Sequence, residues 1–133
     1  MPAIYPVFKK PLPNADNFNG NSLSRCLPQL DGIATNTKVT PLSGFIDSNT
    51  MAREVLDDEQ LANIKVSPVK WLQPEDALLT VRRILAASQE GDIRFQSRRG
   101  DDTDSVINEL KQLEALLVLA ADEGNRFHLL VDM

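Results

Sequence analysis

The chain has 133 residues, a net charge of −5 and one cysteine, and 42% of its residues are hydrophobic. These totals predict a single globular domain over residues 1–133, large enough to bury a core without disulfide support. The negative charge argues against nonspecific binding to nucleic acids or anionic membranes, because both repel it.

No leader or membrane span is expected. Residues 1–13 (MPAIYPVFKKPLP) lack the charged start and apolar run of a signal peptide. The longest apolar run, Ala115 to Ala121, has seven residues, whereas a spanning helix needs roughly 20. A lone cysteine gives no reason to expect an oxidising compartment. We therefore expect a soluble, cytoplasmic protein that binds neither nucleic acid nor membrane.

The N-terminal third predicts a strand followed by a broken helix. Residues 3–8 (AIYPVF) are rich in β-formers, and Pro6 should confine this strand to an edge because it has no N–H to donate. Residues 22–35 carry apolar side chains at helical spacing, with Ser22 as the expected N-cap. Pro28 lies inside this pattern and should divide or kink the helix.

The middle of the chain predicts a loop and two helices. After a mostly irregular stretch over residues 35–48, a helix is expected from Ser48 or Asn49 through residue 56, with an extension that Ser67-Pro68 ends. The clearest helix spans residues 74–88, because proline is favoured at the first helical position. Glu75 and Asp76 suit the positive end of its dipole, and Gly91 is a natural stop.

The C-terminal third predicts a short strand, a long helix and a final strand. Residues 93–96 alternate in polarity, residues 98–102 form a turn, and a helix runs from Thr103 or Asp104 to Glu123. Its half from residue 115 to 121 is apolar all round and should be buried on most sides. With a strand over residues 127–131, the whole predicts an α+β fold, in which three to four helices pack on a small antiparallel sheet that includes strands near both termini.

The sequence offers no convincing catalytic site. His128 is the only histidine, and Cys26 would have to be the nucleophile, but the surroundings LSRCLPQL match no cysteine-enzyme signature. Cys26 lies on an apolar stripe, where a small hydrophobic role is typical. On the final strand His128 is expected to be half-buried or exposed. We therefore assign no catalytic residue, and an enzymatic role is disfavoured although it stays open.

Cofactor and metal sites are not expected either. Both glycine-rich phosphate-binding motifs are missing from the sequence. One cysteine and one histidine cannot complete a structural zinc site without two carboxylates. The acidic clusters at residues 57–59 and 101–104 do not match calcium-loop spacing, and the dipole of the following helix explains the second of them.

Arginines are concentrated between residues 82 and 99. Against acids at positions 90 and 92 the local balance of this stretch is +3, in a chain of −5. A guanidinium grips phosphate or carboxylate with two hydrogen bonds, which makes Arg94, Arg98 and Arg99 candidate binding residues. The alternative is that these arginines form ion pairs with the acids at positions 101, 102 and 104.

Trp71, the only tryptophan, is the other candidate binding residue. Tryptophan is over-represented among binding hot spots. It also stands just before the clearest helix, where Gln73 is the expected cap and Leu72 fills the staple position. Trp71 is then free to pack across Leu78 or on a neighbouring helix, and the sequence does not decide between these roles.

The sequence favours a small noncatalytic protein-binding domain, such as an adaptor, regulator or inhibitor. Its partner would be another protein, and the net charge favours a basic one. The alternative is a small enzyme or ligand-binding domain that uses arginines and carboxylates on a phosphorylated or acidic small molecule. A homodimer is a third hypothesis, because the apolar segment from residue 115 to 121 exceeds what a small core needs.

Overall fold

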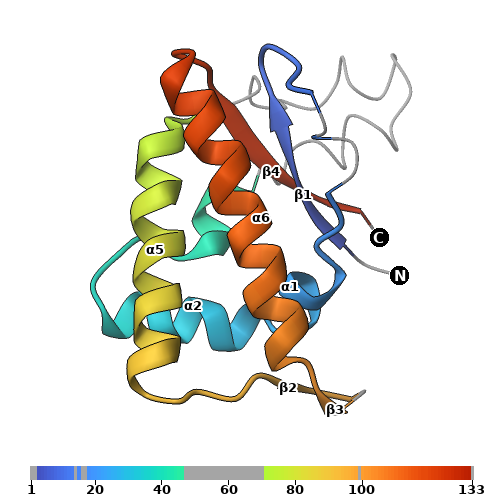
Figure 1. Ribbon diagram of the computed structural model, residues 1–133, viewed down its shortest axis with the longest axis vertical. Coiled ribbons are helices and arrows are strands. Elements are labelled where there is room, and N and C mark those ends of the chain that lie inside the picture. The colour runs from blue at the N-terminus through green and yellow to red at the C-terminus, as the bar shows by residue number, and fades with distance from the viewer. Residues whose placement is uncertain (1–2, 14, 16–17, 47–70, 99, 133) are drawn as a thin grey trace, which may run out of the picture.

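The two terminal strands pair with each other in an antiparallel sheet. β1 (Ala3–Phe8) lies beside β4 (Phe127–Asp132), with Ala3 opposite Asp132 and Phe8 opposite Phe127 (Figure 1). The computed structural model describes residues 3–13, 15, 18–46, 71–98 and 100–132. Within them, helices pack on one face of this sheet, so the predicted α+β fold with strands near both termini is confirmed.

The position of Pro6 follows from the hydrogen-bond pattern of β1. The N–H of Lys9 donates to Arg126 O at 2.8 Å on the β4 side, whereas the N–H of Ile4 donates to Gly20 O at 3.2 Å on the opposite side. Backbone groups alternate along a strand, so Pro6 points the same way as Ile4. Its missing N–H therefore leaves the β1–β4 ladder intact, as expected for an edge strand.

Pro28 divides the first helical region, as predicted. α1 (Asn21–Arg25) ends at Cys26, and α2 (Leu27–Asn36) begins with Pro28 in its first turn, where no N–H is needed. The prediction that Ser22 is the N-cap is wrong, because the N-cap is Gly20 and the helix therefore starts two residues earlier, at Asn21. The reason is a distant acceptor: Glu109 Oε1 accepts the N–H of Leu23 at 3.0 Å, which does the work of a local cap.

Two long antiparallel helices pack on the inner face of the sheet. α5 (Pro74–Glu90) begins at the predicted proline, with Gln73 as its N-cap and Gly91 as its C-cap. α6 (Thr103–Asp122) matches its predicted bounds within one residue. Figure 1 shows the two side by side in opposite directions. The 3₁₀ helix η2 (Leu42–Phe45) and α2 pack against α5.

The core lies between these helices and the inner face of the sheet. That face contributes alternate residues from both strands, and α5 and α6 contribute the stripes that their apolar spacing predicts. The fully buried large side chains are Phe95, Phe127, Ile4, Leu23, Leu30, Leu42, Ile84, Leu110, Leu113, Leu117, Leu129 and Val81.

Two sequence predictions are wrong: the burial of the second half of α6 and the extent of the strand that precedes this helix in the sequence. Ala115 and Leu119 are exposed, Leu119 by 47%, so this half of α6 is not buried on most sides. The strand predicted over residues 93–96 is reduced to β2 (Gln96–Ser97), which pairs with β3 (Gly100–Asp101) in a hairpin. Phe95 is not in a strand because its backbone bonds to the start of α6: Thr103 Oγ1 accepts its N–H, and Asp102 N–H donates to its carbonyl.

The helix predicted to start at Ser48 or Asn49 and the Ser67-Pro68 stop lie outside the described residues. Among the helices that the structure does describe, none is long and apolar enough to cross a membrane. That one domain spans residues 1–133 stays a prediction.

Gly20 provides a test of how closely the chain approaches β1. A Cβ at this position would lie 2.1 Å from the carbonyl oxygen of Ile4, which is backbone and cannot turn away. We expect Gly20→Ala to lower the free energy of unfolding by about 1–3 kcal/mol, the usual effect of overpacking. Urea unfolding followed by Trp71 fluorescence measures it.

Gly32 is the matched control, because nothing lies within 4 Å of a Cβ built there and it is an exposed position inside α2. Gly32→Ala should raise the free energy of unfolding by about 0.5–1 kcal/mol, since alanine favours the helix. Equal destabilisation by both variants would contradict the close approach at Gly20.

Candidate functional site

Trp71 lies beside the outer face of the sheet. Leu72, next to it, adds to the second edge of β4: its N–H donates to Phe127 O at 2.7 Å and its carbonyl accepts the N–H of Phe127 at 3.0 Å. This pairing brings the half-buried indole to a centroid distance of 4.7 Å from the ring of His128, at an interplanar angle of 45°. His128 is a ring partner that the sequence did not suggest.

His128 is buried, with 5% of its surface exposed, so the expectation of a half-buried or exposed side chain is wrong. The physical reason is the contact with Trp71, which comes from a segment 57 positions earlier and is invisible in the alternation of β4 alone. Tyr5, Val7 and Leu130 continue the same outer face of the sheet and are half-buried.

A hollow of about 490 Å³ lies along the free edge of β1. One wall is β1 itself, and the other comprises Pro11, Leu12, Ala15, Phe18 and Asn19 from the chain that follows β1. We call this hollow the β1 groove. Its lining residues are Ala3, Tyr5, Pro6, Val7, Phe8, Pro11, Leu12, Ala15, Phe18 and Asn19.

Both ends of the returning chain are tied to the sheet. At one end Gly20 bridges Ile4, as described above. At the other, the buried amide of Asn125 accepts the N–H of Lys10 at 3.0 Å and donates to its carbonyl at 2.7 Å. These specific contacts therefore close the groove at its two ends. No local sequence pattern predicts this contact, because the hydrogen bonds of Asn125 join positions 115 residues apart.

The described lining of the groove is largely apolar. Among the lining residues that the structure describes, Tyr5 is the one ionisable side chain, and the others are apolar or, in Asn19, a neutral amide. Ligand sites typically combine such apolar walls with a few polar groups, often from the backbone. General acid–base or nucleophilic chemistry needs a carboxylate, imidazole, thiol or activated hydroxyl within reach.

The predicted arginine site is only partly assembled. Arg94 pairs with Asp101 across the β2–β3 segment, and Nε lies 3.0 Å from Oδ2. Arg98 is exposed, and Arg99 lies outside the described residues. Neither Arg94 nor Arg98 lines the β1 groove. Figure 1 places the β2–β3 hairpin at the N-terminal end of α6, whereas β1 ends near the other end of that helix.

Asp101 is held as a carboxylate mainly by Thr103. The Thr103 hydroxyl donates to Asp101 Oδ1, and the Thr103 N–H does so at 2.9 Å. These bonds, with a further contribution from Arg94, lower the pKa of Asp101 to about 2. The carboxylate is thus already engaged on both oxygens, which fits an ion-paired turn.

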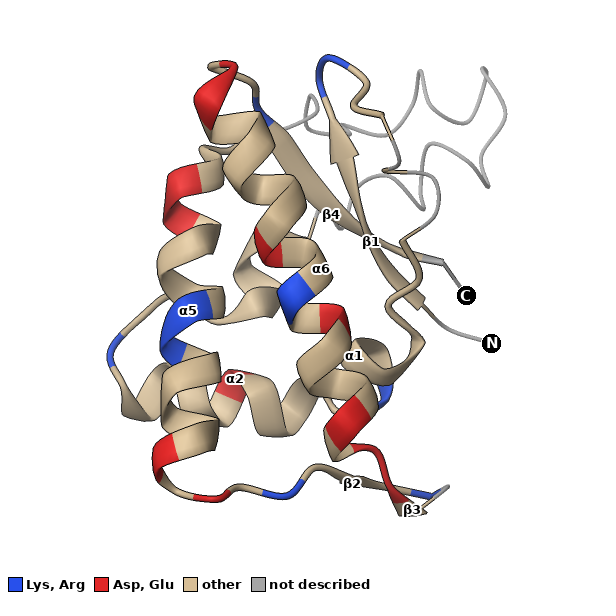
Figure 2. Cartoon of the chain, viewed as in Figure 1, with Lys and Arg blue, Asp and Glu red and all other residues tan. Residues whose placement is uncertain are grey.

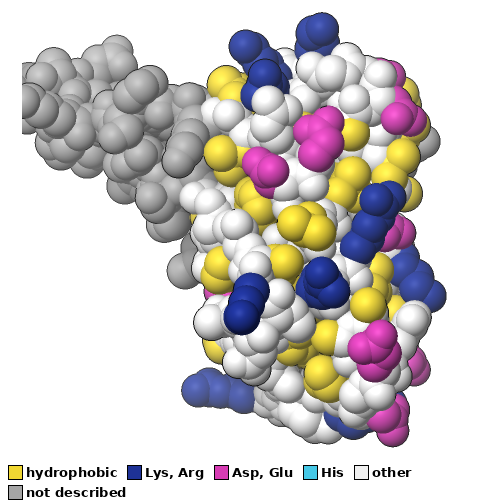
Figure 3. Space-filling view, turned by 90° about the vertical axis from the view of Figure 1, so that its left-hand side faces the viewer, with side chains coloured by type: hydrophobic (Ala, Val, Ile, Leu, Met, Phe, Trp, Pro, Cys, Tyr) yellow, Lys and Arg dark blue, Asp and Glu magenta, His cyan; other side chains and the backbone are white. Residues whose placement is uncertain are grey.

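The other charges are also mixed. Arg82 Nε lies 3.2 Å from Glu114 Oε2, so this pair joins α5 to α6. Figure 2 shows basic residues in the middle of α5 between acidic residues near its two ends. On the α5 side of the molecule, basic, acidic and hydrophobic side chains alternate over the described surface (Figure 3). Two large hydrophobic side chains, Leu79 and Leu119, are exposed on these helices.

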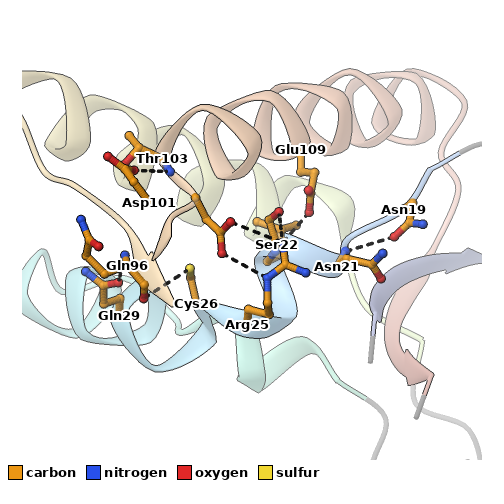
Figure 4. A network of polar contacts seen from close by, with 12 residues as sticks. Asn19, Asn21, Ser22, Arg25, Cys26, Gln29, Gln96, Asp101, Thr103 and Glu109 are labelled. Atoms are coloured by element: carbon orange, nitrogen blue, oxygen red, sulfur yellow. Dashed lines mark hydrogen bonds and ion pairs between the residues drawn. The ribbon is translucent and has the colours of Figure 1, made fainter. Parts of the chain in front are cut away.

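A polar network below α6 is structural (Figure 4). Arg25 Nε lies 3.1 Å from Asp102 Oδ2, and its Nη2 donates to Ser22 Oγ at 2.9 Å. Burial raises the pKa of Glu109, although the Leu23 N–H and the Ser22 donors oppose the rise. The network ties α1 to α6. Sequence reasoning missed Glu109, since one acid on a helix carries no pattern.

Cys26 belongs to the same region and is buried. Its Sγ lies 4.0 Å from the carbonyl oxygen of Gln96. Burial, and then the nearby charge of Asp102, raise the pKa of the thiol. A thiol that resists ionisation is a poor nucleophile, which agrees with the small hydrophobic role expected for it.

Within the part of the chain that the structure describes, no three histidine, cysteine or acidic side chains gather as metal ligands. The acidic cluster at residues 57–59 lies outside that part. Comparison of the chain with protein-family models, with curated proteins and with solved structures finds no match.

Thr103→Val tests the origin of the low pKa of Asp101. Removing the hydroxyl donor should raise that pKa from about 2 toward its ordinary value of 3.8, whereas Thr103→Ser should leave it low. NMR titration of the Asp101 carboxyl carbon measures both variants.

The sign of the linked stability follows from the lowered pKa. The contribution of Asp101 is fully present above about pH 4 and is lost as the pH falls through about 2. Thr103→Val should therefore lose this contribution at a higher pH than the wild type does. Coincident acid-unfolding curves and an unchanged pKa would contradict the assignment.

Trp71→Ala tests whether the indole is a structural element. Because the ring is half-buried, we expect a loss of about 1–3 kcal/mol in the free energy of unfolding, below the roughly 3–5 kcal/mol for fully buried aromatic side chains. Circular dichroism during urea unfolding measures it, with Trp71→Phe as the control that retains a ring against His128. A neutral Trp71→Ala variant would leave only a binding role for this side chain.

Proposed function

We propose that this protein is a small noncatalytic domain that binds another protein through the β1 groove. The observation that carries the proposal is the groove itself, which is bounded at both ends by the hydrogen bonds of Gly20 and Asn125 and whose described lining residues are uncharged. A preformed site reduces the ordering cost of association.

Trp71 extends the proposed binding surface around the sheet. Its indole lies on the outer face, to which Tyr5 and Val7 of the groove also belong. Aromatic residues that are partly buried yet accessible are frequent anchors in protein interfaces. The structural and the binding role of Trp71 are therefore compatible.

The charge expected of the partner differs between its whole surface and the part that contacts this protein. The net charge of −5 favours approach of a basic protein. At contact distance the nearest charges count most, because salt screens the others beyond about 8 Å. Lys9 and Lys10 follow β1 directly and are exposed. We therefore propose a partner with acidic groups where it passes the end of β1.

The alternative, a domain that uses arginines and carboxylates on a phosphorylated or acidic small molecule, has one supporting observation: Arg94 and Asp101 do come together. It is the lesser proposal because both are exposed and already satisfy each other. A homodimer also remains a proposal, for which the exposed Leu79 and Leu119 offer apolar surface.

Filling the groove tests the proposed function. Ala15 lines the groove and is half-buried, so Ala15→Trp should fill it, while Ala86→Trp makes the same change at an exposed position of α5. A partner is first recovered on the tagged protein, identified and purified. Calorimetry with the purified partner should then show affinity at least about tenfold lower for Ala15→Trp only, or about 1.4 kcal/mol.

Thermal unfolding of both variants checks that the fold is retained. A purified partner that binds Ala15→Trp as well as it binds the wild type would contradict the groove as the binding surface.

A further inference from the structure

The free edge of β1 presents backbone hydrogen-bonding groups to the groove. Ile4, Pro6 and Phe8 have their N–H and C=O positions on the side away from β4, because Ile4 bonds to Gly20 there and Lys9 bonds to Arg126 on the β4 side. No residue that the structure describes bonds to the carbonyl of Pro6 or the N–H of Phe8. Both residues are buried and line the groove.

From this geometry we infer that the β1 groove binds an extended segment of the partner protein, which adds to β1 as a further strand along Pro6–Phe8. The inference rests on the proposed function, since it specifies how a protein would occupy the groove. A carbonyl of the segment accepts the N–H of Phe8, and an N–H of the segment donates to the carbonyl of Pro6. Such backbone pairing with an exposed sheet edge is an established mode of peptide recognition.

The lining of the groove fits the side chains of an extended segment. Successive side chains of a strand point to opposite sides, and the groove offers apolar contacts on both: Val7 on the outer side, and Leu12 and Phe18 on the side toward the core. Apolar residues are therefore expected over Pro6–Phe8. Pro6 has no N–H, so pairing at this point leaves no backbone donor of β1 without a partner.

Charge complementarity predicts which residues flank the apolar centre of the segment. Lys9 and Lys10 are exposed immediately after β1, and the backbone of Lys10 is fixed by Asn125. A segment that runs along β1 passes these lysines at one end, so acidic residues at that end form short-range ion pairs.

A single segment fits this site better than the β1 strand of a second copy. In a second copy, β1 already carries β4 on one edge and its own returning chain on the other. Its free edge is therefore recessed in the same way, and two recessed edges cannot approach to hydrogen-bonding distance. A segment without a folded neighbour on its other edge can enter the groove.

Selection of random nine-residue peptides displayed on phage against the whole protein tests the inference. Enriched peptides should have an apolar centre and an acidic flank. They should bind Ala15→Trp at least about tenfold more weakly than Ala86→Trp. Reversing Lys9 and Lys10 to glutamate should weaken them by a similar factor, whereas the same change at the exposed Lys38 and Lys111 should not.

Amide hydrogen exchange identifies the mode of binding. In the free protein the N–H of Phe8 has no backbone partner in the ladder, and those of Tyr5 and Val7 face β4. Binding of an enriched peptide should slow exchange at Phe8 by at least about tenfold and leave the two ladder amides as internal references.

The outcomes separate the two proposals. Peptides that require an open groove but leave exchange at Phe8 unchanged would overturn strand addition and leave the proposed function standing. Peptides that bind Ala15→Trp normally, or a selection that enriches no peptide, would overturn the inference. Normal binding of the purified partner to Ala15→Trp would overturn the proposed function as well.

Discussion

The pairing of β4 with both of its neighbours is the constraint on which the rest of the structure depends. On one edge it meets β1 from the other end of the chain, and on the other it meets Leu72 and Ile46 through isolated bridges. These contacts join residues far apart in sequence, and the pairing with Leu72 fixes the entry to α5. The inner side chains of β4, Phe127 and Leu129, then complete the core beneath α5 and α6.

Much of the remaining order comes from single side chains that satisfy backbone groups at a distance. Glu109 on α6 accepts the N–H of Leu23 at the start of α1, and Asn125 holds both backbone groups of Lys10. Thr103 accepts the N–H of Phe95. A buried backbone group without a partner is costly, so each of these contacts specifies a turn that hydrophobic burial alone would leave undetermined.

The contrast between local signals and long-range contacts explains what could be predicted from the sequence. α5 was predicted closely because its signals are local: Pro74 at the start, acids in the first turn, an apolar stripe and Gly91 at the end. Terminal strands could be predicted from composition. Ser22 as a cap was wrong because Glu109 lies 87 positions away, and the burial of His128 was missed because it depends on Trp71. The β1 groove could not be predicted either, because the contacts of Gly20 and Asn125 that bound it join residues distant in sequence.

The free edge of β1 also has features that prevent unwanted pairing between sheets. Pro6 and the lysines after Phe8 are among the devices by which natural edge strands avoid aggregation, and the returning chain shields the edge. Protection alone, however, would be served best by a chain packed directly on β1, because an open hollow loses dispersion contacts on both walls. Here the returning chain contacts β1 at Gly20 and is held at Lys10, and the described lining residues between them border a hollow of about 490 Å³ with β1. The proposed addition of a single extended segment to an edge that is shielded against other sheets accounts for both observations.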